Sequence, residues 1–396
     1  MINRMHIAPF ALLGSHSSLW RLFVALALLL CSASIALAGS REQAARIHDR
    51  LAGVPADDAT ITAMVNAGLP DGAATIAMNN PNFYAVTLKN FAAPWTNRDQ
   101  NAFVPLNDYV TLVMGMVRDN VPFNQILSAN MLYMAPGVSP PPSASSNAHF
   151  EALENRMRDP AFVQSELQPT TQTAIYGTPD AAAAGAMTTR AAAEAFFIAG
   201  TNRAMFRFTL MNHMCMDMEQ VHDTSIAPDR IRQDVSRSPG GDSRVFLNNC
   251  IGCHAGMDPL AQAFAYYDFD ETSTAMIYNP SAVHPKYFNN DTTFAEGFVT
   301  PDDSWHNHWR QGQNALIGWN GALPGQGNGA KSLGEELAGT QAFAQCQVQK
   351  VFKAVCLRDP VDASDRTQID AMTNTFRGAY NLKQVFAATA GYCMGN

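Results

Sequence analysis

Cys250-Ile251-Gly252-Cys253-His254 is the stretch on which the interpretation of this 396-residue chain depends. The spacing C-x-x-C-H is the attachment signature of c-type haem. Two thiols three positions apart, on one turn of backbone, can reach one edge of a haem, and the adjacent imidazole can then bind the iron. Gly252 is expected to leave room for the porphyrin. The sequence therefore predicts one covalent haem c, with Cys250 and Cys253 as attachment points and His254 as the proximal iron ligand.

Two other interpretations of this motif compete with haem attachment. A thioredoxin-like redox pair would need a strand that leads into a helix, and Phe246-Leu247-Asn248-Asn249 is a poor strand. Half of a zinc site would need a second pair of Cys or His ligands, and the chain has no other C-x-x-C. Because the motif occurs once, we expect a monohaem protein and not a dihaem peroxidase.

Residues 1–38 have the pattern of a secretory signal peptide. Arg4 and Arg21 are the charged residues of this segment, an apolar run follows to Cys31, and the segment ends in Ala36-Leu37-Ala38. A basic start, an apolar middle and an Ala-x-Ala ending predict cleavage after Ala38. A membrane anchor would need about 20 apolar residues, and this run is shorter. We therefore expect a periplasmic or otherwise exported protein, with no transmembrane span after cleavage.

The charge of the chain limits its partners. The formal net charge of −8 becomes −10 when Arg4 and Arg21 are removed with the signal peptide. An acidic surface without basic tracts argues against nucleic acid and against anionic membrane surfaces. A protein partner in a redox reaction is compatible with this surface.

Four cysteines remain outside the haem motif and the signal peptide, and they allow three pairings. Export would place them where disulfides persist. If residues 341–357 form one helix, Cys346 and Cys356 lie about 15 Å apart, which is too far for a disulfide. An up-down-up arrangement of the last three helices brings the ends of the first and third together. This arrangement favours Cys356–Cys393 and leaves Cys215 for Cys346.

The predicted fold class is mainly α, with helical domains around a cytochrome c-like haem site and long irregular loops. We expect helices over 107–117, 188–199 and 202–221, and again over 331–357, 364–377 and 381–391. Met257-Asp258-Pro259 is expected to start a new helix that runs to about Tyr267. The predicted organisation is a signal peptide (1–38), an N-terminal helical region (39–135), a linker or loop-rich segment (136–177), a haem-binding region (178–300), and a loop followed by a C-terminal helical region (301–396).

Several blocks together resemble the cytochrome-associated domains of unknown function found in planctomycetes and marine proteobacteria. Residues 250–260 resemble the family's CxxCHxxxDPLG motif, and residues 263–268 are similar to its aromatic AFExFD turn. Similar blocks also occur at residues 46–55, 122–127, 184–189 and 333–358. The chain departs from the family at Arg244, where relatives often carry histidine, and at Ala261, where they have glycine. The resemblance implies a periplasmic haem protein but no particular reaction.

The second axial ligand of the iron decides between functions. Met276, 22 residues after His254, is the preferred candidate because Met/His ligation is common in c-type cytochromes. His284, His222 and His213 are weaker candidates. A closed iron would favour electron transfer, alone or within a larger periplasmic redox complex. An open iron would favour an enzyme acting on peroxide or oxygen, and a third possibility is a structural or assembly protein with architectural haem.

His306-Asn307-His308 is a further candidate for metal binding. A closed metal site would need additional ligands, and the sequence does not place them. The alternative is a loop packed on the protein surface between Trp305 and Trp309.

Overall fold

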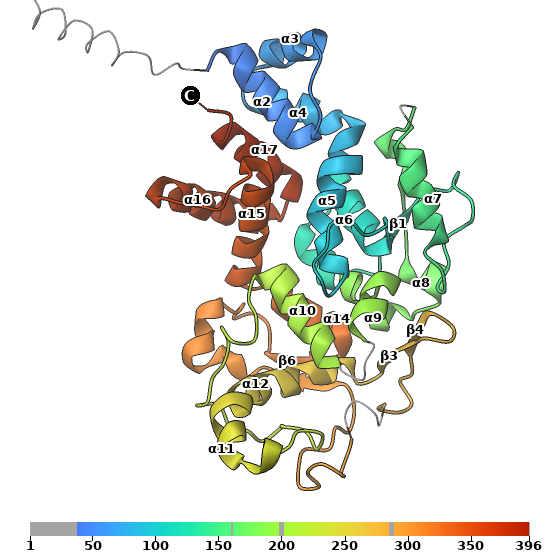
Figure 1. Ribbon diagram of the computed structural model, residues 1–396, viewed down its shortest axis with the longest axis vertical. Helices are drawn as coiled ribbons and strands as arrows, with labels where there is room; N and C mark the ends of the chain where they lie inside the picture. Colours follow the sequence, from blue (N-terminus) through green and yellow to red (C-terminus); the bar gives the residue numbers. More distant parts are fainter. Residues whose placement is uncertain (1–37, 160, 198–201, 285–288, 396) are drawn as a thin grey trace, which may run out of the picture.

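The computed structural model describes residues 38–159, 161–197, 202–284 and 289–395. The predicted signal peptide, apart from Ala38, lies outside the described residues. The rest is mainly helical, with three two-stranded antiparallel sheets of three or four residues per strand. The prediction of a mainly α fold is confirmed. The molecule is elongated, with helices α2 to α4 at one end and α11 and α12 at the other (Figure 1).

The N-terminal end is a cluster of three helices: α2 (Ser40–Ala52), α3 (Asp58–Ala67) and α4 (Asp71–Asn79). The side chain of Asp57 caps α3 by accepting a hydrogen bond from the Thr60 N–H. The cluster also packs on the C-terminal helix α17 (Leu382–Tyr392). The two ends of the described chain therefore meet in one helical body.

The central helix α6 (Asp108–Arg118) follows the short α5 (Lys89–Ala92) and is buried from Asp108 to Val117. Asn107 caps it by accepting a hydrogen bond from the Val110 N–H. The buried carboxylate of Asp108 accepts hydrogen bonds from the N–H groups of Arg190 and Ala191 at the start of α9 (Arg190–Phe196). Two of the N–H groups that lack a partner within the helix are thereby satisfied, so this contact fixes α9 against α6.

The segment 136–177 belongs to this folded body. It contains α7 (Ala148–Met157), β2 (Gln168–Thr170) and α8 (Gln172–Tyr176). Strand β2 pairs with β1 (Leu132–Met134), and the Tyr176 hydroxyl donates to Asp108. The segment is therefore tied to the core by backbone and side-chain hydrogen bonds.

Helix α10 spans Asn202–Met214, so the predicted extension to residue 221 is wrong. Cys215 adopts a left-handed backbone conformation, with φ of 54°, and forms a disulfide with Cys346. A left-handed residue cannot continue a right-handed helix, and the chain turns away at this point.

Helix α12 (Ile251–Ala261) begins earlier than the sequence predicted. It continues directly from α11 (Ser243–Val245) and a π-helical turn at Phe246–Cys250, so the C-x-x-C-H motif is itself helical. The predicted helix start at residue 257 is wrong, and Pro259 lies inside the last turn of α12. The helix also ends at Ala261, because the chain turns into the hairpin of β3 (Tyr267–Asp270) and β4 (Ala275–Tyr278) before residue 267 can be helical.

The C-terminal part confirms the expected helices with one break. It comprises α14 (Gly329–Ala338), α15 (Gln341–Cys356), α16 (Ala363–Ala379) and α17. Thr340 separates α14 from α15 and caps the latter through the Phe343 N–H. Ahead of them, β5 (Ser304–His306) pairs with β6 (Gln326–Asn328) in a long irregular segment.

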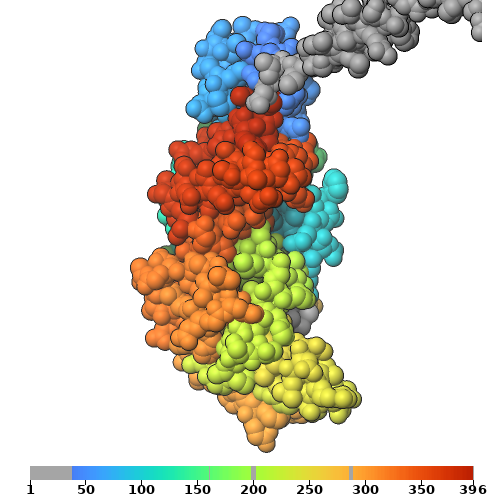
Figure 2. Space-filling model, turned by 90° about the vertical axis from the view of Figure 1, so that its left-hand side faces the viewer, coloured from blue at the N-terminus to red at the C-terminus, as the bar shows by residue number. Residues whose placement is uncertain are grey.

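Both predicted disulfides are confirmed. Cys356 and Cys393 join the end of α15 to the end of α17, with Cα atoms 5.5 Å apart. Cys215 and Cys346 join the end of α10 to α15, with Cα atoms 5.3 Å apart. Figure 2 shows the C-terminal helices in red beside the middle of the molecule, above the orange, green and yellow segments that form its lower end. The Cys215–Cys346 disulfide thus connects these helices to the end of α10, from which the chain continues toward α12.

Candidate haem attachment site

The three residues of the predicted attachment site share one face at the start of α12. Cys250 immediately precedes the helix, and Cys253 and His254 lie in its first turn. Residues three and four positions apart are neighbours on a helix surface. Both thiols are free and partly exposed, whereas Cys215, Cys346, Cys356 and Cys393 are all in disulfides. The structure therefore brings the predicted residues together with both sulfurs available.

The opposite face of α12 is closed by aromatic rings. A Cβ atom on Gly252 would lie 2.5 Å from Nε2 of His222, and one on Gly256 would lie 1.9 Å from Nε1 of Trp309. Gly252 is two residues from Cys250, which is about 200° around the helix. The prediction that Gly252 leaves room for a porphyrin is therefore wrong, because the ring of His222 occupies that space.

The two thiols have different surroundings. Cys250 packs against a small apolar cluster of Ile231, Val235, Phe246 and Ala255, whereas Cys253 packs against the main core. Burial raises the pKa of Cys253, and the charge of Glu219 raises it further. A raised pKa keeps the thiol protonated, and the preceding turn is helical and not a strand. The helical turn argues against a thioredoxin-type pair, which follows a strand.

The ring of His254 is held by a carboxylate that the sequence analysis missed. Its Nδ1 atom lies 3.1 Å from Oδ1 of Asp258, one helical turn further on. Metal-binding histidines commonly donate their second ring N–H to a carboxylate, which fixes the tautomer and the ring orientation. This contact leaves Nε2 of His254 as the ligand atom. The spacing of four residues between a histidine and an aspartate was the signal that could have found it.

Asp258 in turn belongs to a buried network of charges. Its carboxylate, which is fully buried, accepts hydrogen bonds from Nε and Nη2 of Arg203 at 2.7 and 3.1 Å, and from the Arg232 backbone N–H at 3.2 Å. Arg203 also binds Asp234 through two hydrogen bonds of 2.7 Å. Burial alone would raise the pKa of Asp258, but the charges of Arg203 and Arg232 outweigh it and hold that pKa well below its usual range. The carboxylate next to His254 is therefore ionised.

The candidates for the second axial ligand lie on other elements. Met276 is in β4, opposite Phe269 of β3, and this hairpin packs against α9; its role as a ligand stays a prediction. His222 lies behind α12, as described above. His213 is buried near the far end of α10, with Nε2 2.6 Å from the Tyr109 hydroxyl. Nε2 of His284 lies 3.3 Å from Oδ2 of Asp268.

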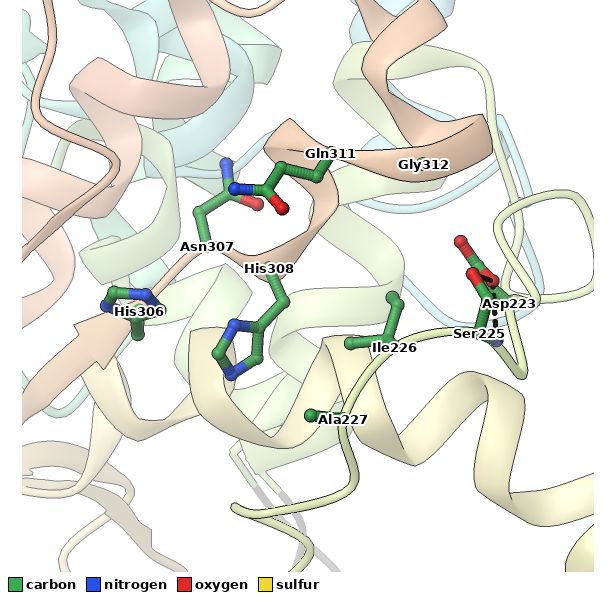
Figure 3. A pocket seen from close by; sticks show the side chains of 9 residues that line it. All are labelled: Asp223, Ser225, Ile226, Ala227, His306, Asn307, His308, Gln311 and Gly312. Atoms are coloured by element: carbon green, nitrogen blue, oxygen red, sulfur yellow. Dashed lines mark hydrogen bonds between the residues drawn. The ribbon is translucent and has the colours of Figure 1, made fainter.

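His306 and His308 line a polar pocket of about 300 Å³ together with Asp223, Ser225, Ile226, Ala227, Asn307, Gln311 and Gly312 (Figure 3). The imidazole centres of the two histidines are 4.8 Å apart. Within the described ranges no three His, Cys, Asp or Glu side chains are grouped so that they could hold a metal ion. The pocket adjoins the back of α12, because the Asp223 N–H donates to the Gly252 carbonyl at 3.0 Å.

Among the residues that the structure describes, no helix is both long enough and apolar enough to cross a bilayer. Comparisons of the chain with models of protein families, with curated proteins and with solved structures gave no match.

Proposed function

We propose that this chain is an exported, monohaem c-type cytochrome-like protein that acts in electron transfer, alone or as a subunit of a larger periplasmic redox complex. The observation that carries the proposal is the face of α12 on which Cys250, Cys253 and His254 lie together. Their thiols are free although every other described cysteine is paired. The blocks around residues 184–270 support membership of the cytochrome-associated family that they resemble.

The residues at this site fit a covalently bound haem. Cys250 and Cys253 would form the two thioether bonds, and Nε2 of His254 would bind the iron. Asp258 would hold the proton at Nδ1 of His254, which fixes the neutral tautomer with Nε2 unprotonated. The bound haem would supply a one-electron redox centre.

Export and a protein partner complete the proposal. Two disulfides fit a compartment in which disulfides persist, which agrees with the predicted signal peptide at residues 1–38. The acidic chain suits a redox protein partner and argues against nucleic acid.

Purification of the chain after export in a host with the c-type haem maturation system tests this proposal. We expect one haem per chain that remains bound after denaturation, and its loss in the Cys250→Ala/Cys253→Ala variant. The Cys356→Ala/Cys393→Ala variant, which also removes two cysteines, should keep its haem. A wild-type protein without covalent haem would refute the proposal and return the thiols of Cys250 and Cys253 to the redox interpretation.

An open-site haem enzyme acting on peroxide or oxygen is the second candidate. The ionised carboxylate on His254 favours it, because stronger donation to the iron assists cleavage of an O–O bond. Spectra of the oxidised and reduced protein, with and without carbon monoxide, separate the two. A low-spin spectrum that carbon monoxide does not change supports electron transfer, and a high-spin spectrum that shifts supports the enzyme.

A further inference from the structure

We propose that Asp258 is a positioning residue that lowers the reduction potential of the haem iron through its hydrogen bond to His254. The inference rests on the proposed function, since it concerns the same iron. It assigns a role to a carboxylate outside the attachment motif.

The first step is the geometry of the hydrogen bond. His254 and Asp258 are four residues apart on α12, and Nδ1 lies 3.1 Å from Oδ1. The Asp258 side chain is fully buried, and the His254 side chain is 21% exposed. With water excluded from the carboxylate, its interaction with the ring is stronger than the same pair would be in solvent.

The second step is what keeps the carboxylate in place. Arg203, at the start of α10, binds both oxygens of Asp258 and is itself held by Asp234. The Arg232 backbone adds a third donor to Asp258. A carboxylate fixed by donors from two other segments cannot rotate away from His254, so the ring orientation is set by tertiary structure and not by the helix alone.

The third step is the effect on iron. An imidazole that donates its Nδ1–H to a carboxylate is a more basic ligand at Nε2. A more basic ligand and a nearby negative charge both stabilise ferric over ferrous iron, and second-shell hydrogen bonding is one of the ways in which a protein sets a haem potential. The charges of Arg203 and of Arg232, whose Nε lies 3.9 Å from Oδ2 of Asp258, moderate this effect. They do not remove it, because Asp258 still accepts the His254 proton.

The test is the midpoint potential of purified holoprotein, measured by spectroelectrochemical titration for the wild type and for Asp258→Asn. We expect the variant to retain one covalent haem and to have a potential higher by at least a tenfold change in the ferrous-to-ferric ratio, which is about 59 mV for one electron. Asp365→Asn is the matched control. Asp365 is also a buried carboxylate with two hydrogen bonds from an arginine, Arg358, but it lies in α16. The haem midpoint potential of the Asp365→Asn variant should equal that of the wild type.

A second variant covers the case in which Asp258→Asn does not fold, since it leaves the charge of Arg203 without one of its two carboxylate partners. Arg203→Gln/Asp258→Asn removes one charge of each sign and should also show a raised potential. A haem-loaded variant with the wild-type potential overturns this inference alone. Absence of haem from the wild type overturns the proposed function, and the inference with it.

Discussion

The close contact between Gly256 and Trp309 predicts that Gly256→Ala destabilises the protein. Gly256 lies within α12, where alanine is favoured over glycine by about 1 kcal/mol from helix propensity alone. The added Cβ, however, would lie 1.9 Å from Nε1 and 2.4 Å from Cε2 of Trp309. Tertiary contact and local propensity therefore act in opposite directions at this position.

The distances set the size of the effect. Non-bonded heavy atoms in contact are about 3.5 Å apart, so the indole would have to move by about 1.5 Å. Trp309 is fully buried, with its ring centre 5.7 Å from that of Phe206, so the movement strains other packed side chains. Inserting a methyl group into a packed core typically costs about 1–3 kcal/mol. Subtracting the helix-propensity gain of about 1 kcal/mol leaves a net loss of about 0–2 kcal/mol. Because Trp309 is fully buried and cannot move freely, we expect Gly256→Ala to fall in the upper half of this range.

Gly378→Ala is the matched control for this prediction. Gly378 lies in α16, and a Cβ there would meet nothing within 4 Å. We expect this variant to gain about 0.5 kcal/mol, the lower part of the range for such a substitution. Urea denaturation followed by circular dichroism should place Gly256→Ala below the wild type and Gly378→Ala at or above it. Equal midpoints for the two variants would refute the packing argument.

Two further predictions concern the disulfides and a buried lysine. In the chain-entropy model, the Cys356–Cys393 bond, with a separation of 37 residues, should contribute about 4 kcal/mol, and the Cys215–Cys346 bond, with a separation of 131 residues, about 5 kcal/mol. Both paired alanine variants should therefore unfold at lower urea concentrations than the wild type, and the Cys215→Ala/Cys346→Ala variant at the lowest. A lower midpoint for Cys356→Ala/Cys393→Ala would contradict this account. Burial lowers the pKa of Lys350 to about 7 from its usual 10.5, so between these pH values the unfolded state binds the extra proton and the free energy of unfolding rises with pH. Lys350→Met should remove that part of the slope, and an unchanged slope between pH 7 and 9 would show that Lys350 is not its source.

The sequence alone determined the features that depend on local spacing. The C-x-x-C-H spacing placed Cys250, Cys253 and His254 together because three- and four-residue intervals bring side chains to one face of a helix. Helical periodicity gave the mainly α class and the last three helices. Their lengths, an up-down-up arrangement and the limit on the distance between bonded cysteines together paired all four remaining cysteines correctly.

Other features of the site depend on contacts between distant segments. Pro259 suggested a helix start near residue 257, but the chain is already helical from Ser243. Gly252 suggested space for a ligand, but His222 from a separate loop fills it. Nothing local to either residue shows which partner will be packed against it.

The charge network around His254 is the clearest case. The i,i+4 spacing of His254 and Asp258 is visible in the sequence, but Asp258 alone would be an ordinary helical carboxylate. Its burial and fixed orientation come from Arg203, 55 residues away, and from the backbone of Arg232, 26 residues away. Spacing along the chain determined which residues share the face of α12, and only the tertiary structure decided what holds them, because a buried charge needs partners that separate segments must supply.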